Sequence, residues 1–142
     1  MDREALTRQM IRHEGIALRP YLCPAGRVTI GVGRNLEDVG ITETEAMLLL
    51  HNDLDRVEGE LQRLLPVFND LNDVRRCALM DMCFNLGISR FRMFQRLMTA
   101  INNQDFALAS REMLDSRWAK QVGERARHLA RMMETGKEFH DE

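Results

Sequence analysis

The stretch 13–35, HEGIALRPYLCPAGRVTIGVGRN, decides the fold expected for this chain. It follows a segment whose apolar residues fall near one face of a helix, at Leu6, Met10 and Ile11. Gly15 then supplies the residue type that tolerates the left-handed conformation in which many helices end. We therefore expect a helix that ends at Glu14 and, after it, a β-hairpin over residues 19–32.

Glu14 falls at the last turn of this expected helix. Negative charge is unfavourable at that end of the helix macrodipole, so ionisation of the carboxyl group is opposed there. Such a group suits chemistry in which a proton must be held near neutral pH and then given up. The alternative is an ordinary solvated carboxylate at a helix end, and the position of Glu14 alone does not decide between the two.

The residues that follow Glu14 keep a definite spacing. Eight residues separate it from Cys23, and five more lead to Thr29, which begins the sequence T-I-G-V-G. Two further blocks stand later in the chain: LNDVRRCALMDMCFNLG at 71–87 and SRWAKQVGERARHLARMMETG at 116–136. In their order and spacing the three blocks resemble the phage-type lysozymes, the muramidases of glycoside hydrolase family 24. The resemblance covers nearly the whole chain, although the segment after the first block is much shorter than in the T-even phage members.

The remaining sequence predicts a mostly helical α+β protein. Thr42, with Glu45 three residues on, forms a capping box that starts a long helix, and Pro66 ends it. A second helix, from about 71 to 86, is apolar nearly all round and should be central and buried. Shorter helices are expected at about 91–101, 105–114 and 121–134.

The resemblance implies one lysozyme-like catalytic domain with a bilobal fold. It comprises a small N-terminal hairpin lobe at about 14–50, a long connecting helix at about 43–65, and a helical C-terminal lobe at about 66–142 that includes the N-terminal helix. The substrate cleft is expected between the lobes, where ligand sites commonly fall.

Length and composition agree with a single domain. The chain has 142 residues, of which 44% are hydrophobic, and its formal net charge is -2. That charge gives no electrostatic support for binding nucleic acid. The sequence begins without an apolar run of the length that a signal peptide or membrane helix needs, so we expect folding in a cytosol. The three cysteines, an odd number, are best interpreted as reduced thiols.

Residue 23 decides how much of the family's chemistry carries over, because Cys23 stands where the family has aspartate. Glycoside hydrolysis needs an acid, here Glu14, and a second group that acts at the anomeric carbon. The pKa of a free thiol is about 8.5, so a thiol substitutes poorly for the charge of aspartate. Two alternatives stay open: a tolerated small hydrophobic residue, or a thiolate nucleophile whose pKa is lowered by arginines such as Arg27, Arg34 or Arg125.

The resemblance assigns further residues to the site. Thr29 is expected to hold a water with its hydroxyl, and burial in the cleft should raise the pKa of Glu14. Arg125 occupies the position of an arginine that pairs with the catalytic glutamate, while Arg34 and Asp53 are expected to form an ion pair between the lobes. The expected substrate-binding residues are Tyr21, Arg34, Asn35, Phe84, Asn85 and Arg125.

Other side chains are open to more than one interpretation. Glu37 and Asp38, on the shortened connection, are conceivable substitutes for the missing aspartate, although no spacing places them. Phe84 can offer its face to a sugar or pack in the core, and Trp118 is expected in the core.

The resemblance implies an endolysin that hydrolyses the β-1,4 bond between N-acetylmuramic acid and N-acetylglucosamine in bacterial peptidoglycan. No metal or other cofactor is expected, because the four histidines lack ligand spacing. The protein should be a monomer that does not insert into a membrane and that stays in the host bacterial cytoplasm until a membrane pore, a holin, releases it. Two alternatives stay open: a lytic transglycosylase that uses Glu14 alone, and a low-activity peptidoglycan-binding relative.

Overall fold

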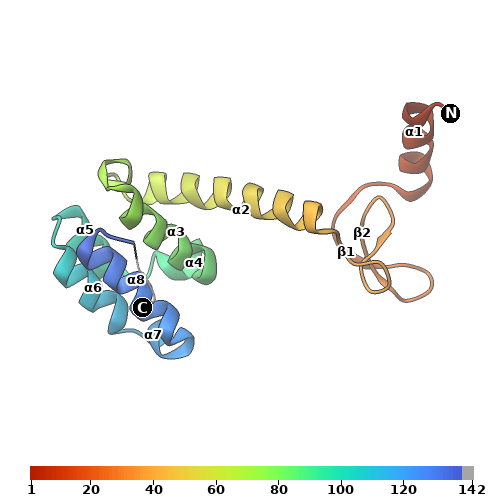
Figure 1. Cartoon of the computed structure of the whole chain (residues 1–142). Helices are drawn as coiled ribbons and strands as arrows, with labels where there is room; N and C mark the ends of the chain where they lie inside the picture. The colour runs from red at the N-terminus through yellow and green to blue at the C-terminus, as the bar shows by residue number, and fades with distance from the viewer. Residues whose placement is uncertain (139–142) are drawn as a thin grey trace. The chain divides into compact units, whose positions relative to one another are not determined.

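The computed structural model describes residues 1–138 and divides into two compact units, Met1–Leu49 and Leu50–Glu142. Helices predominate in the chain (Figure 1). A small antiparallel sheet of three strands lies in the first unit. The predicted fold class, a mostly helical α+β protein, is therefore confirmed. Each unit is described by itself below.

Unit 1 opens with the predicted helix, α1, Arg3–Glu14. The side chain of Asp2 caps its first turn by accepting a hydrogen bond of 3.0 Å from the N–H of Ala5. Gly15 ends the helix with φ +73°, a conformation that favours glycine, as its position in the sequence predicts. None of the residues of α1 is buried.

The sheet of unit 1 follows directly. Its strands are β1 (Ala17–Leu22), β2 (Val28–Gly31) and β3 (Arg34–Asn35), hydrogen-bonded in that order as antiparallel neighbours. The first two strands form the predicted hairpin, with an irregularity in register between Ala17 and Tyr21. The two-residue strand β3 is too short to leave an alternating pattern in the sequence, and it was not predicted.

The long helix α2, Glu43–Leu64, spans the boundary between the units. Its predicted capping box is present: the N–H of Thr42 donates to Oε1 of Glu45 at 2.9 Å, and the N–H of Glu45 donates to Oγ1 of Thr42 at 3.1 Å. Both predicted ends are confirmed within two residues. The buried side chains of α2, Val57 and Leu61, lie in its second half.

The core of unit 2 forms around α3, Asp73–Leu86, which is capped by Asn72 and ends at Gly87 as predicted. Its buried residues are Ala78, Leu79, Met82, Cys83 and Leu86. The predicted central place of this helix is confirmed, but its burial is incomplete, because Cys77 and Phe84 are exposed. One face of α3 therefore remains accessible.

The other helices of unit 2 are α4 (Ile88–Phe91), α5 (Gln95–Asn102), α6 (Phe106–Leu114), α7 (Arg117–Val122) and α8 (Glu124–Thr135), after a short 3-10 turn at Phe68–Asp70. α8 packs against α3 and α6, which Figure 1 allows the reader to follow. The predicted helix 121–134 is in fact two helices, because Gly123 breaks it with φ +58°. The predicted helix 91–101 likewise begins only at Gln95.

Arg75 joins the start of α3 to the end of α8. Its Nε donates to the carbonyl oxygen of Met133 at 2.7 Å, and its Nη2 donates to that of Glu134 at 2.9 Å. The guanidinium also stacks on the ring of Phe106, 3.7 Å from the centroid. These contacts fix the two helices that carry Asp81 and Arg125, discussed below.

Candidate functional site

Glu14, the last residue of α1, contacts the turn between β2 and β3. The contact is with Gly33: a Cβ added there would lie 2.8 Å from Oε2 of Glu14 and 3.0 Å from its Cδ. Gly33 also has φ +70°, so the backbone favours glycine at this position, and a larger residue would displace the Glu14 carboxylate. Within unit 1 the side chain of Glu14 is exposed, whereas burial was expected.

Three predicted site residues form a row across the sheet. Tyr21 of β1 and Asn35 of β3 are each paired in register with Thr29 of the central strand β2. Directly paired residues of neighbouring strands point to the same face of a sheet. The sheet therefore brings Tyr21, Thr29 and Asn35 together, as a hairpin alone would not.

Thr29 is buried, with 3% of its surface exposed. Its hydroxyl donates to the carbonyl oxygen of Arg27 at 2.8 Å, and the oxygen keeps lone pairs with which it can accept. The hydroxyl also faces the thiol of Cys23, whose pKa it helps to lower. The hydroxyl proton is engaged by the Arg27 carbonyl, and the water that was expected on Thr29 stays a prediction.

Cys23 begins the turn between β1 and β2. Its N–H donates to the carbonyl oxygen of Arg27 at 3.0 Å, and its own carbonyl accepts from the N–H of Gly26 at 2.8 Å. Hydrogen bonding from the backbone of Arg27 is the largest influence on the thiol and lowers the pKa of Cys23, although partial burial opposes the change. The structure therefore brings Cys23 and Thr29 together, and hydrogen bonding lowers the pKa of the thiol. The choice between a tolerated small residue and a thiolate nucleophile stays open.

Glu37 and Asp38 are both engaged near this turn. Oε2 of Glu37 accepts from Nη1 of Arg27 at 3.3 Å, and its Oε1 accepts from the N–H of Val28 at 3.0 Å. Asp38 accepts from the side-chain amide of Asn35 at 2.9 Å and lies 3.8 Å from Nε of Arg27. Neither is a free carboxylate of the kind that a substitute for aspartate requires.

Arg34 pairs with a different carboxylate from the one predicted. Its Nη2 lies 2.8 Å from Oε2 of Glu45, and its Nη1 donates to the carbonyl oxygen of Gly40 at 3.0 Å. This pair, with the capping hydrogen bonds of Thr42, lowers the pKa of Glu45 to about 2. The predicted partner, Asp53, instead lies 3.4 Å from Nη2 of Arg56 on its own helix. Each residue of the predicted pair thus has another partner within its own unit, and the pair of Arg34 with Asp53 stays a prediction.

Unit 1 also contains a cavity of about 800 Å³ beside the sheet. Gly33, Arg34 and Asn35 line it together with apolar residues of the segment 30–49. Two of the predicted substrate-binding residues, Arg34 and Asn35, therefore border the same hollow.

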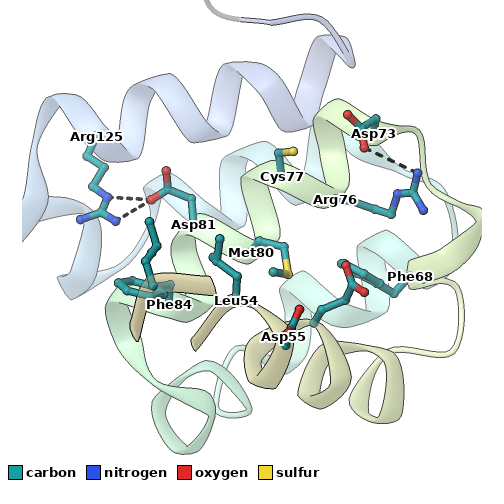
Figure 2. A pocket seen from close by; sticks show the side chains of 12 residues that line it. Leu54, Asp55, Phe68, Asp73, Arg76, Cys77, Met80, Asp81, Phe84 and Arg125 are labelled. Atoms are coloured by element: carbon teal, nitrogen blue, oxygen red, sulfur yellow. Dashed lines mark hydrogen bonds and ion pairs between the residues drawn. The ribbon is translucent and has the colours of Figure 1, made fainter. Parts of the chain in front are cut away.

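Unit 2 has a separate cavity of about 600 Å³ along the accessible face of α3 (Figure 2). Phe84 lines it with 41% of its surface exposed, which excludes the interpretation of Phe84 as a core residue. Figure 2 shows Arg125 pointing to Asp81, whose Oδ1 lies 2.6 Å from Nη2 and accepts from Nε at 2.8 Å. Asp81 was not singled out from the sequence, and a pair of Arg125 with Glu14 stays a prediction.

Asn85 and Trp118 are linked within unit 2. The indole Nε1 of Trp118 donates to Oδ1 of Asn85 at 2.8 Å. Trp118 is 2% exposed, so its predicted place in the core is confirmed. The bond fixes the amide of Asn85 with its NH₂ group left to donate elsewhere.

The cysteines of the chain are all free thiols. Burial raises the pKa of Cys83 to about 11, and burial likewise raises the pKa of Cys77. Within residues 1–138 no three or more His, Cys, Asp or Glu side chains gather in a group that could hold a metal ion. Over the same residues no helix has the length and apolar character needed to cross a membrane.

The sequence was compared with protein families. The family model described as phage lysozyme matches residues 11–134, a range that includes Glu14, Cys23, Thr29 and Arg125. The chain belongs to the phage lysozyme family. The match covers both units, and the family predicted from the three sequence blocks is confirmed.

Individual relatives support the assignment to the phage lysozyme family. An endolysin of Acyrthosiphon pisum secondary endosymbiont phage 1 is 33% identical over 113 residues, which cover 77% of this chain and 73% of the relative. A probable T4-type lysozyme 1 of Dictyostelium discoideum is 26% identical and covers 87% of this chain and 89% of the relative. The pre-baseplate central spike protein Gp5 of Enterobacteria phage T4 is 26% identical over 93% of this chain, but only 28% of that longer protein is matched.

Proposed function

We propose that this phage lysozyme family member is an endolysin that hydrolyses the β-1,4 bond between N-acetylmuramic acid and N-acetylglucosamine in bacterial peptidoglycan. The observation that carries the proposal is the contact of the Glu14 carboxyl group with Gly33, in the motif that also contains Thr29. An acid at a helix end is ambiguous by itself. An acid that lies against the glycine of the motif expected beside it is a much more specific arrangement.

In this proposal Glu14 protonates the departing sugar oxygen as general acid. Cys23 and Thr29 form the second catalytic group, and their hydrogen bonds to the same carbonyl oxygen of Arg27 support treating them as a pair. The proposed substrate-binding residues are Tyr21, Arg34 and Asn35 of unit 1 with Phe84, Asn85 and Arg125 of unit 2. Both units, in one catalytic domain, are therefore needed for activity.

A specific observation keeps a second function in view. The Thr29 hydroxyl donates to a backbone carbonyl, and the group beside it is a thiol instead of a carboxylate. If this pair cannot activate a water, Glu14 alone can serve as acid and base while the 6-hydroxyl of muramic acid attacks, as in a lytic transglycosylase. If neither reaction occurs, the protein is a low-activity peptidoglycan-binding relative.

One digestion separates these possibilities. Purified peptidoglycan is incubated with the protein, and the new chain ends are identified by mass spectrometry. We expect reducing ends. Anhydro-sugar ends would instead establish the transglycosylase, and binding without any new ends would establish the low-activity relative.

The role of Glu14 is tested in the same assay with Glu14→Gln, which keeps the shape of the side chain and removes the acidic proton. General acid catalysis contributes about 10²- to 10⁴-fold, so the variant should lose activity to that extent while staying folded. Glu4→Gln, an exposed acid in the first turn of the same helix, is the matched control and should keep full activity. Activity of Glu14→Gln within a few-fold of the parent would contradict the assignment.

We also propose that the protein is a monomer, needs no metal or cofactor and waits in the host bacterial cytoplasm for a holin pore. The relative named endolysin supports this setting. Expression in bacteria with and without a co-expressed membrane pore tests it: lysis should follow only when the pore is present. Lysis without the pore would contradict the proposed dependence.

A further inference from the structure

One peptide group holds both residues of the proposed second catalytic group. The carbonyl oxygen of Arg27 accepts from the N–H of Cys23 at 3.0 Å and from the hydroxyl of Thr29 at 2.8 Å. The orientation of this carbonyl therefore fixes the backbone of Cys23 at the start of the turn, and it also fixes the direction of the Thr29 hydroxyl. Whatever fixes the peptide group between Arg27 and Val28 also fixes the pair.

The opposite side of that peptide group is bound by Glu37. Its N–H, which belongs to Val28, donates to Oε1 of Glu37 at 3.0 Å. The second carboxylate oxygen, Oε2, accepts from Nη1 of Arg27 at 3.3 Å. Glu37 thus contacts both the side chain of Arg27 and the N–H of Val28. The peptide group between Arg27 and Val28 cannot turn without breaking the bond from that N–H.

The backbone of Glu37 is itself held at the end of the sheet. The N–H of Leu36 donates to the carbonyl oxygen of Val28 at 2.8 Å, and the Asn35 side chain accepts from the N–H of Asp38 at 3.0 Å. A carboxylate that accepts from a peptide N–H also polarises that peptide, so its carbonyl becomes a stronger acceptor. Glu37 is therefore placed to strengthen the bonds on the far side of the same group.

We propose that Glu37 is a positioning residue for the Cys23 and Thr29 pair, acting through the peptide group between Arg27 and Val28. The inference depends on the proposed function in one respect: it assumes that this pair takes part in the reaction. Glu37 lies in the shortened connection after β3, a segment to which the family resemblance assigned no role. Glu37 itself does not contact the substrate.

Kinetics of two variants test the proposal. Glu37→Ala removes both contacts, whereas Glu37→Gln keeps an oxygen that can still accept from the N–H of Val28. We expect kcat to fall about 2- to 10-fold in Glu37→Ala, the effect of losing one hydrogen bond, with KM little changed. Glu37→Gln should recover most of the loss. Glu43→Ala, which removes an exposed charge near the start of α2, is the control and should match the parent.

The thiol of Cys23 gives a second readout that does not require activity. In a Cys77→Ser background, the rate of alkylation against pH reports the pKa of Cys23, because Cys83 is buried. Loss of a nearby negative charge alone would lower the pKa of Cys23. Loss of positioning should raise it, because displacement of Arg27 also weakens the hydrogen bonding from its backbone, the largest of the influences that lower the pKa. The two effects have opposite signs, so the direction of the change decides between them.

A raised Cys23 pKa in Glu37→Ala, with a smaller rise in Glu37→Gln, supports the proposal even if the parent protein proves inactive on peptidoglycan. An unchanged or lowered Cys23 pKa in Glu37→Ala overturns it. Equal losses of kcat in Glu37→Ala and Glu37→Gln also overturn it, because only the charge would then matter.

Discussion

Replacing Gly33 with alanine should separate the position of Glu14 from the stability of the fold. The added methyl group would lie 2.8 Å from Oε2 of Glu14, and ordinary contact begins at 3.4 Å, so the oxygen must retreat by about 0.6 Å. A carboxylate at the end of a flexible side chain can make this movement at little cost to folding. It then no longer lies where the turn holds it in the parent protein.

Gly31→Ala is a matched control for this substitution. Gly31 and Gly33 both have φ +70°, so alanine is strained to a similar extent at either position, by about 1 to 2 kcal/mol. A Cβ at Gly31 would meet nothing within 4 Å, whereas a Cβ at Gly33 meets Glu14. The two variants therefore share the backbone strain and differ in the contact with the proposed acid.

The free energy of unfolding from denaturant titration should fall by a similar amount in both variants. In a peptidoglycan digestion assay, kcat of Gly33→Ala should fall roughly 10- to 100-fold, because misplacing a reacting group by about 1 Å can cost 100-fold. The kcat of Gly31→Ala should fall by less than about 3-fold, because this substitution only loosens the turn and does not displace Glu14. Equal losses of kcat in the two variants would refute the reasoning, as would full activity of Gly33→Ala.

Three further predictions follow from other parts of the structure. Leu79→Ala, at a side chain with no exposed surface, should lower the free energy of unfolding by about 2 to 5 kcal/mol in denaturant titration, and a loss under about 1 kcal/mol would remove α3 from the core. The pair of Arg34 with Glu45 lowers the pKa of the Glu45 carboxyl group from 4.5 to about 2, so the pair stabilises the fold above pH 4.5 and this stabilisation is lost as pH falls through 2. The difference in Tm between the parent and Glu45→Gln should therefore shrink over that range. A constant difference in Tm would contradict the prediction. If Cys23 is a poor substitute for a carboxylate, Cys23→Asp should raise activity or leave it high. If its thiolate is a nucleophile, Cys23→Ser should abolish turnover. Both roles would be contradicted if Cys23→Ala were as active as the parent and Cys23→Asp.

Features that depend on neighbouring residues could be predicted from the sequence. The end of α1 at Gly15 and the capping box of Thr42 with Glu45 each involve residues within a single helical turn. Their residue types are rarely used together for another purpose. The position of Glu14 at a helix end followed from the same local signals.

Partners of charged side chains could not be predicted in this way. Glu45 and Asp53 are both acids of α2, eight residues or about 12 Å apart along the helix axis, and nothing in the sequence tells which of them Arg34 can reach. Asp81, the observed partner of Arg125, is 44 residues away in the chain, and the block that contains it does not indicate which residue it pairs with. Such choices depend on how helices pack, which local periodicity does not record.

The turn that begins at Cys23 shows what residue identity alone could not predict. The sequence presents a thiol in place of a carboxylate, and a neighbouring arginine was one way in which its pKa could be lowered. The backbone of Arg27, followed by that of Ala25, instead lowers the pKa of the thiol by hydrogen bonding. Groups that donate to a thiolate can also donate to a carboxylate, so hydrogen bonding in this turn favours negative charge at residue 23. The backbone of the turn thus offers hydrogen bonds that would suit the aspartate expected from the family resemblance, and the same hydrogen bonds stabilise the thiolate of Cys23.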